Sequence, residues 1–221
     1  MHNSVNKLIS LKREILEISH NLNKNKGDAK IIAVSKTFSM SDILPLINHG
    51  HVDFGENKIQ EAMEKWTDIK NDFSHLQLHM IGKLQTNKVK YAIKLFDYIH
   101  SLDSMKLAEK ISSEQIKQGK KVKIFIQVNI GQEPQKGGIE VDDLENFYQV
   151  CSSKLGLNVV GLMCIPPEND QPLTYFKKIK TLNDKFSLKE LSIGMSNDYL
   201  EALKCYPTFV RIGSKIFGKR T

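Results

Sequence analysis

Cysteine is scarce in this sequence, with three residues among 221. Cys151, Cys164 and Cys205 are far apart and show no C-x-x-C spacing, so the sequence indicates neither a disulfide framework nor a zinc site. No apolar run approaches the ~20 residues that a membrane-spanning helix needs. The amino terminus also lacks the apolar stretch of a secretion signal. These absences predict a cytoplasmic protein that binds no metal and does not enter a membrane.

Linkers of low complexity are also absent, so we expect one domain over residues 1–221. Hydrophobic residues make up 40% of the chain and charged residues 26%, which is typical of a soluble protein with one large core. Gly82-Lys83 lacks the upstream glycine of a P-loop and the hydroxyl residue after its lysine. The sequence therefore gives no support to a nucleotide site.

Positive charge exceeds negative charge, with a formal net charge of +7, which leaves an anionic ligand or nucleic acid open. The densest group of lysines lies at the end of a predicted helix and in the turn before a strand: Lys117, Lys120, Lys121 and Lys123. Lysines in such positions are usually solvated, and the other charges are scattered. We therefore expect no nucleic-acid binding.

The hydrophobic pattern alternates between short strand-like runs and stretches with helical spacing. Strands are expected near residues 31–36, 51–54, 76–81, 96–100, 122–129, 157–163, 190–193 and 208–212, and most are followed by a helical pattern. An amphipathic helix is expected over residues 1–25 and Ser41-Asp42 as a helix cap. Eight such units predict an α/β fold, a single (β/α)₈ TIM-type barrel with an extra N-terminal helix packed on it. A doubly wound open sheet is the competing architecture.

Lys36 ends the first predicted strand, Ile31-Ile32-Ala33-Val34-Ser35-Lys36. In α/β folds ligands bind at the carboxyl ends of the strands, and a partly desolvated lysine there can lose its proton and attack an aldehyde. Lysines also close strands simply by reaching into water, so this residue needs partners to indicate a site.

The last two predicted loops suit a phosphate group. Ser196 follows Gly194 at a helix start, and Arg211 precedes Gly213 and Ser214 in the final loop. Taken singly, these serines could equally be helix caps. Together with Lys36 they fit a phosphorylated aldehyde, for which pyridoxal 5'-phosphate (PLP) is the obvious candidate; a phosphosugar aldolase could use the same parts.

Six ordered motifs resemble the pyridoxal phosphate homeostasis proteins, single-domain relatives of the alanine racemase N-terminal barrel. The resemblance runs from about residue 30 to the end. The motifs are Ala33-Val34-Ser35-Lys36-Thr37, Phe54-Gly55-Glu56-Asn57-Lys58-Ile59-Gln60-Glu61, the segment from His79 to Lys88, Gly161-Leu162-Met163, the segment from Leu191 to Ser196, and the segment from Arg211 to Gly218.

The resemblance implies a PLP site with Lys36 as the Schiff-base lysine. It also implies that the phosphate is held by Ser196, Gly213 and Ser214, and that Arg211 faces the pyridine nitrogen, where a cation disfavours ring protonation and so weakens PLP as an electron sink. Asn57 and Met163 match residues near the ring; a helix cap for the first and core packing for the second are equally open.

Two departures from the family pattern concern other loops: Lys83 stands where histidine is common, and Gly138 is a second glycine in the loop that contains Lys136. They put in doubt any role for Lys83 or for a second lysine site at Lys136. His75 and His79 are four residues apart on a predicted strand, a spacing that does not suit shared metal binding. His49 and His51 flank a turn and are expected in solvent.

The sequence thus predicts a PLP carrier or buffer in vitamin B6 homeostasis, without turnover, that acts as a monomer and exchanges PLP with acceptor apoenzymes. The alternative is a PLP-dependent racemase or related enzyme. In the racemases, the resemblance implies, a tyrosine from a following β domain is the second base. We expect no such residue here, because the chain ends after the eighth unit.

Overall fold

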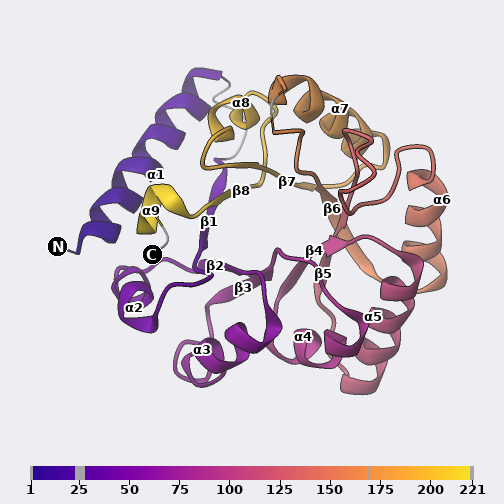
Figure 1. Ribbon diagram of the computed structural model, residues 1–221, viewed down its shortest axis with the longest axis horizontal. Coiled ribbons are helices and arrows are strands. Elements are labelled where there is room, and N and C mark those ends of the chain that lie inside the picture. The colour runs from indigo at the N-terminus through magenta and orange to yellow at the C-terminus, as the bar shows by residue number, and fades with distance from the viewer. Residues whose placement is uncertain (1, 23–27, 169, 220–221) are drawn as a thin grey trace.

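Eight parallel strands form a closed barrel in chain order (Figure 1), which confirms the predicted (β/α)₈ architecture. The structure is a computed structural model that describes residues 2–22, 28–168 and 170–219. Closure is achieved because β1 pairs with both β2 and β8. The strands are β1 (Lys30–Val34), β2 (Asp53–Glu56), β3 (Gln77–Met80), β4 (Tyr98–Leu102), β5 (Lys123–Gln127), β6 (Asn158–Met163), β7 (Glu190–Met195) and β8 (Phe209–Ile212).

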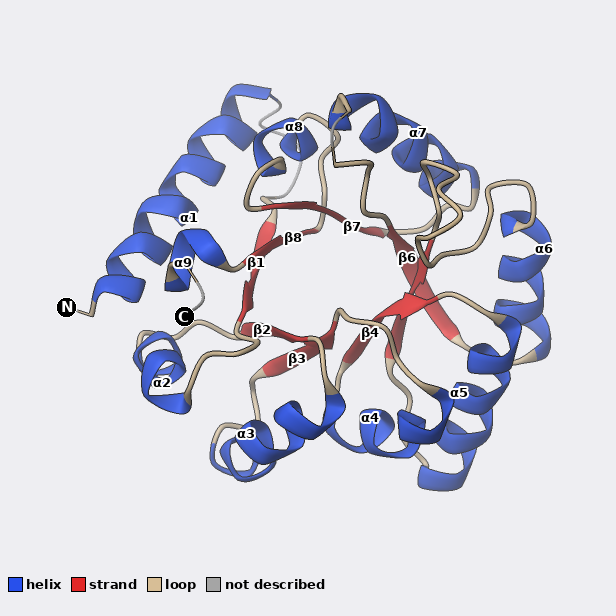
Figure 2. Ribbon diagram, viewed as in Figure 1, coloured by secondary structure: helices blue, strands red, loops and turns tan. Residues whose placement is uncertain are grey.

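Helices surround the strands as an outer layer (Figure 2), as parallel strands require for their crossover connections. They are α1 (Asn3–Leu22), α2 (Met40–Asn48), α3 (Ile59–Asp72), α4 (Val89–Leu95), α5 (Met105–Gln118), α6 (Leu144–Gln149), α7 (Pro172–Lys185), α8 (Tyr199–Leu203) and α9 (Ser214–Phe217). A 3₁₀ turn (Thr86–Lys88) precedes α4, and a π-helical turn (Val150–Lys154) follows α6.

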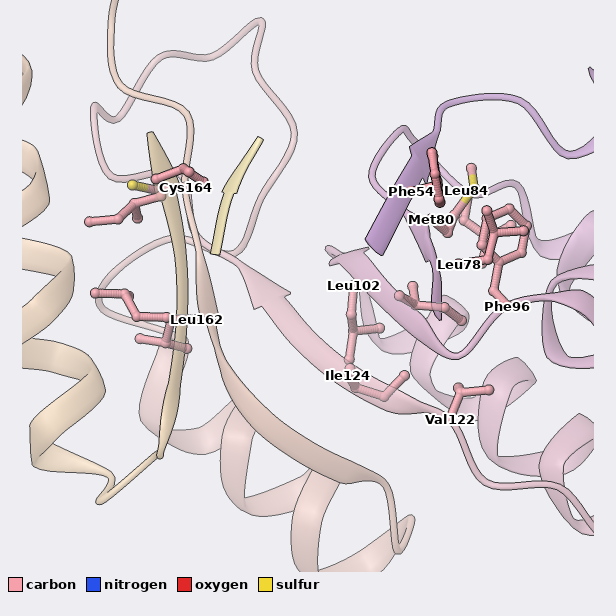
Figure 3. Packing of buried hydrophobic residues seen from close by; sticks show 14 of the residues in the cluster. Phe54, Leu78, Met80, Leu84, Phe96, Leu102, Val122, Ile124, Leu162 and Cys164 are labelled. Carbon is pink, nitrogen blue, oxygen red and sulfur yellow. The ribbon is translucent and has the colours of Figure 1, made fainter. Parts of the chain in front are cut away.

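The main hydrophobic core lies between the strands and this helical layer. Figure 3 shows Phe54, Leu78, Met80 and Phe96 gathered together, and each of the four is at most 1% exposed. Trp66 of α3 packs on Phe54 with ring centroids 5.0 Å apart. Burying each large apolar side chain stabilises the fold by about 1.5–3 kcal/mol, so this layer holds the strands in place.

The interior of the barrel is filled by a second, mainly aromatic group. Its buried members are Ile32, Tyr98, Phe125, Met163 and Phe209. The Tyr98 and Phe209 rings meet edge to face with centroids 5.5 Å apart. This packed interior forms a floor under the carboxyl ends of the strands.

The N-terminal helix is amphipathic, as expected, and packs on the barrel's outer layer beside α9, α8 and α2 (Figure 1). Val5, Leu8, Leu11 and Ile15 are each at most 5% exposed. The expected continuation of this helix to residue 25 lies outside the described residues.

Several element starts differ from the prediction by one or more residues, and α2 and β2 show why. Helix α2 is capped by Ser39 rather than by Ser41-Asp42, because the Asp42 carboxylate accepts the Ser39 backbone N–H in a capping box. Strand β2 begins at Asp53 rather than at His51, because the His51 N–H is used to close α2 on the Leu46 carbonyl at 3.0 Å.

The prediction that His51 lies in solvent is wrong, whereas that for His49, which is exposed, is confirmed. His51 is 3% exposed, its Nε2 lies 3.0 Å from the Asp53 carbonyl oxygen, and its ring meets Phe54 edge-on. Burial, reinforced by the positive charge of Lys12, lowers the pKa of His51 from 6.5 to about 4.

Acidification should therefore destabilise the protein through His51. The folded state binds fewer protons than the unfolded state between pH 6.5 and about 4, so this contribution is fully present above pH 6.5 and is lost as the pH falls towards 4. The loss amounts to about 3 kcal/mol. Urea unfolding at several pH values should show a weaker pH dependence for His51→Gln than for the unaltered protein. The variant His49→Gln, at an exposed position, should show the same pH dependence as the unaltered protein. If the unfolding free energy changed equally with pH in all three proteins, His51 would not be the group responsible.

Candidate functional site

A cavity of about 490 Å³ opens at the carboxyl ends of the barrel strands. Six of the seven predicted site residues line it: Lys36, Asn57, Ser196, Arg211, Gly213 and Ser214. They come from β8 and from the segments that follow β1, β2, β7 and β8. Residues that are up to 178 positions apart in the chain, from 36 to 214, are thus brought to one end of the barrel, where ligands bind in this fold.

Met163 is the seventh predicted residue and does not line this cavity. Its side chain is 1% exposed and lies in the aromatic group inside the barrel. The structure therefore places Met163 in core packing, the alternative that its sequence left open.

Lys36 lies in the turn after β1, two residues beyond Val34. Val34 and Lys36 both line the cavity, so the Lys36 side chain is placed at the barrel mouth. Its side chain is half-buried. An amine in this position can reach a ligand in the cavity while it is partly shielded from water.

Asn57 faces the cavity and is not the helix cap that its sequence left open, because Lys58 occupies the cap position of α3. Gly82 lies against the Asn57 backbone. A Cβ atom at Gly82 would lie 2.5 Å from the Asn57 carbonyl oxygen, a distance that real Cβ atoms do not show. Glycine is therefore required at position 82, and this close contact constrains the position of the Asn57 backbone.

Arg211 is a buried cation at the cavity floor, 5% exposed. Its Nη1 donates to the Ser192 carbonyl oxygen at 2.7 Å and to Ser192 Oγ at 2.8 Å, and its Nη2 donates to the Cys164 carbonyl oxygen at 2.9 Å. Burial lowers the pKa of the guanidinium, although arginine keeps its charge in proteins. These three bonds go to neutral oxygens, so the site retains a positive potential that favours an anion.

A chain of hydrogen bonds continues from Arg211 through the barrel interior. Ser192 Oγ lies 2.9 Å from His100 Nδ1, His100 Nε2 lies 2.9 Å from His79 Nδ1, and His79 Nε2 lies 3.0 Å from Asp53 Oδ1. Burial lowers the pKa of both imidazoles, so both rings are neutral near pH 7.

The direction of this chain follows from its ends. The Asp53 carboxylate can only accept, so His79 Nε2 carries a hydrogen and His79 Nδ1 accepts from His100 Nε2. His100 Nδ1 then accepts from the Ser192 hydroxyl, whose oxygen accepts from Arg211. Every donor points away from the cavity, and the guanidinium is held in one orientation.

The loops after β7 and β8 are joined at the cavity wall. The Gly213 N–H donates to Ser196 Oγ at 3.3 Å. Gly194 lies near the end of β7, just before the first of these loops, and has φ +87°. A Cβ atom there would lie 2.6 Å from the Ala202 Cβ, so this position requires glycine. Ser214 begins α9, and the first N–H groups of a helix have no partner within the helix. Hydroxyls and backbone N–H groups thus gather on this wall of the cavity.

Lys83 and Lys136 lie in the two loops that differ from the family pattern, and neither residue lines this cavity. Lys83 is exposed. Lys136 donates to the Pro166 carbonyl oxygen at 3.0 Å and pairs with Glu133, so its ammonium is engaged in holding two loops together.

The described part of the chain, residues 2–22, 28–168 and 170–219, contains no group of three or more His, Cys, Asp or Glu side chains that could hold a metal ion. None of its helices is both long and apolar enough to cross a membrane. Its three cysteines are buried thiols, and burial raises the pKa of Cys151 and Cys164 to about 12.

Comparison with known proteins assigns a family. The family described as "Alanine racemase, N-terminal domain" matches residues 8–221. A relative from Aquifex aeolicus, named pyridoxal phosphate homeostasis protein, is 34% identical over 99% of this chain and 99% of its own length. A protein of the same name from Haemophilus influenzae is 33% identical over 90% of this chain and 88% of its own.

Solved structures agree with this assignment. PipY of Synechococcus elongatus, solved with PLP bound, is 32% identical to this chain and has a TM-score of 0.80. The match covers 92% of this chain and 100% of the PipY chain. The same protein without PLP gives 0.83. Alanine racemase from Corynebacterium glutamicum shares the fold, with a TM-score of 0.68 at 20% identity over 60% of its length. This chain therefore belongs to the pyridoxal phosphate homeostasis proteins, a family that carries the alanine racemase N-terminal domain.

Proposed function

We propose that this protein binds PLP as a reversible Schiff base on Lys36 and acts as a carrier or buffer in vitamin B6 homeostasis, without turnover. The observation that carries the proposal is that an amine, a buried guanidinium and a wall of hydroxyls and glycine line one cavity. The relatives' names and the PLP-bound form of PipY support the same ligand.

The residues of the cavity fit PLP. Its volume of about 490 Å³ lies within the range of small-molecule sites. Ser196, Gly213 and Ser214 would hold the phosphate, Arg211 would face the pyridine nitrogen, and Asn57 would contact the ring. Bound there, PLP would supply an aldehyde that condenses with the Lys36 amine with loss of water.

Each side chain would have a task that needs no chemistry beyond holding the ligand. The fixed Arg211 guanidinium would keep its positive charge beside the ring nitrogen and so disfavour a proton there. Lys36 would release the ligand when water or an acceptor amine replaces it. We propose a monomer that works in the cytoplasm and passes PLP to apoenzymes.

A racemase would need acid and base groups on both faces of its substrate. Among the described residues that line the cavity, Lys219 is the one amine besides Lys36, and neither tyrosine nor histidine is present. This composition favours the carrier over the racemase.

Borohydride reduction of the protein after incubation with PLP tests the proposal. We expect a yellow protein whose reduced pyridoxyl group maps by peptide mass spectrometry to Lys36. A protein that stays unlabelled in excess PLP would overturn it. In parallel, incubation with L-alanine and PLP should form no D-alanine, and steady formation of D-alanine would reject the carrier without turnover in favour of the racemase.

A further inference from the structure

Lys65 of α3 holds the backbone on both sides of Lys36. Its Nζ donates to the Ser35 carbonyl oxygen at 2.9 Å and to the Phe38 carbonyl oxygen at 3.3 Å. The Lys65 side chain is 12% exposed, so its ammonium lies largely out of water behind the strand end. One cation from the helical layer therefore ties down the segment that carries the proposed Schiff-base lysine.

A buried carboxylate balances this cation. Glu56 is fully buried, and its Oε1 lies 2.6 Å from Lys65 Nζ. The same oxygen accepts from Ser35 Oγ at 2.8 Å and from Trp66 Nε1 at 3.0 Å. Burial raises the pKa of Glu56, while Lys65 opposes this effect, so the ammonium makes a charged Glu56 tolerable at this position.

A second carboxylate holds the turn after Lys36. Glu61 Oε1 accepts the Thr37 backbone N–H and lies 2.9 Å from Lys65 Nζ. Thr37 has φ +68°, in the left-handed region that costs a residue with a Cβ about 1 kcal/mol or more. Such a conformation persists when its surroundings fix it, and here Glu61 and Lys65 provide that constraint.

We propose that Lys65 is a positioning residue for Lys36: with Glu56 and Glu61 it fixes the strand end and the strained turn that direct the Lys36 amine into the cavity. The inference rests on the proposed function in taking Lys36 as the reacting amine. A displacement of about 1 Å at a reacting group can change its rate by about 100-fold, so control of this short segment matters.

The substitution Lys65→Met tests the role, because it keeps an unbranched side chain, one atom shorter, and removes the charge. Ser35 and Phe38 lose their donor, and Glu56 and Glu61 lose their shared cation. We expect Lys36 in the PLP-free protein to react about tenfold to 100-fold more slowly with acetic anhydride, because an amine that turns from the partly shielded cavity into water keeps its proton and is a weaker nucleophile. Mass spectrometry of the Lys36 peptide measures this rate. Release of PLP from the loaded protein should become faster.

Lys70→Met is the matched control. Lys70 also lies on α3, its side chain is 17% exposed, and it pairs with Asp97 and the Leu95 carbonyl oxygen, away from the Lys36 segment. Both variants should lose stability, but the Lys70 variant should keep the Lys36 reaction rate. Equal effects of the two substitutions on that rate, or no effect of either, would overturn the proposal.

Two further variants keep the test decisive if Lys65→Met does not fold. Lys65→Arg retains the cation and should keep most of the Lys36 reaction rate. Glu61→Gln, at a partly exposed position, weakens the hydrogen bond to the Thr37 N–H and should lower the rate severalfold. An unchanged rate in Glu61→Gln would reject the proposal. Because these rates are measured without PLP, they stay informative even if the unaltered protein takes no PLP label, a result that would count against the proposed function alone.

Discussion

Replacing Lys36 with alanine is expected to abolish covalent attachment of PLP. Lys36 is the half-buried amine at the end of β1 in the cavity that also holds Arg211 and the Ser196–Gly213 wall. Those groups remain in Lys36→Ala and should still bind the phosphate, but reversibly and more weakly. We expect the affinity to fall by at least about 100-fold, equivalent to about 2.8 kcal/mol. Equilibrium dialysis and the loss of the yellow colour measure the two effects.

Two comparison variants separate chemistry from charge. Lys36→Arg keeps the positive charge but has no amine that can be deprotonated, so it too should stay colourless. Lys30→Ala removes an exposed lysine from the opposite end of the same strand and should leave binding unchanged. A reduced pyridoxyl group retained on Lys36→Ala, or lost from Lys30→Ala, would count against Lys36 as the attachment point.

Alanine at Gly161 is expected to disrupt the barrel itself. Gly161 of β6 stands opposite Glu190 of β7, and a Cβ atom would lie 2.0 Å from the Glu190 carbonyl oxygen and 2.7 Å from the Phe125 ring. Backbone on one side and a buried ring on the other leave no room to yield. We expect Gly161→Ala to lose more than about 4 kcal/mol of unfolding free energy, or to accumulate as insoluble protein.

Gly156→Ala is the matched control for this effect. Gly156 lies shortly before β6, has φ +60°, and would place its Cβ in open space. That change should cost only about 1 kcal/mol, from backbone conformation alone. Thermal unfolding of both variants would decide between them, and a Gly161 variant as stable as the Gly156 variant would show that the strands can separate without cost.

The architecture was predictable because each unit carries its own local signal. Eight alternations of a short apolar run and a helical pattern indicate a barrel before any pairing is known. Element edges were less accessible. Strand β2 was expected at residues 51–54 but consists of Asp53, Phe54, Gly55 and Glu56. Its two carboxylates obscured these bounds, because their partners, His79 and Lys65, lie 26 and 9 positions further along the chain.

The site was predictable to the extent that it lies at strand ends, a position that the unit boundaries reveal. Lys36, Arg211 and the two glycine-containing loops could be located in this way. The position of Met163 could not be predicted. Whether its side chain faces the cavity or the core depends on the register of β6, which shifts against β5 between Ile124 and Phe125. The buried histidines were missed for a similar reason: His79 and His100 make contacts across the barrel that leave no periodic signal in the sequence.

The one-way chain from Arg211 to Asp53 also limits how this protein can change over evolutionary time. Its five members come from β2, β3, β4, β7 and β8, and each satisfies the next. Losing one member leaves a buried polar neighbour unsatisfied, which costs about 1–3 kcal/mol. An apolar replacement is therefore tolerated only when the whole set is exchanged, so these five positions should be inherited, or redesigned, as a single unit.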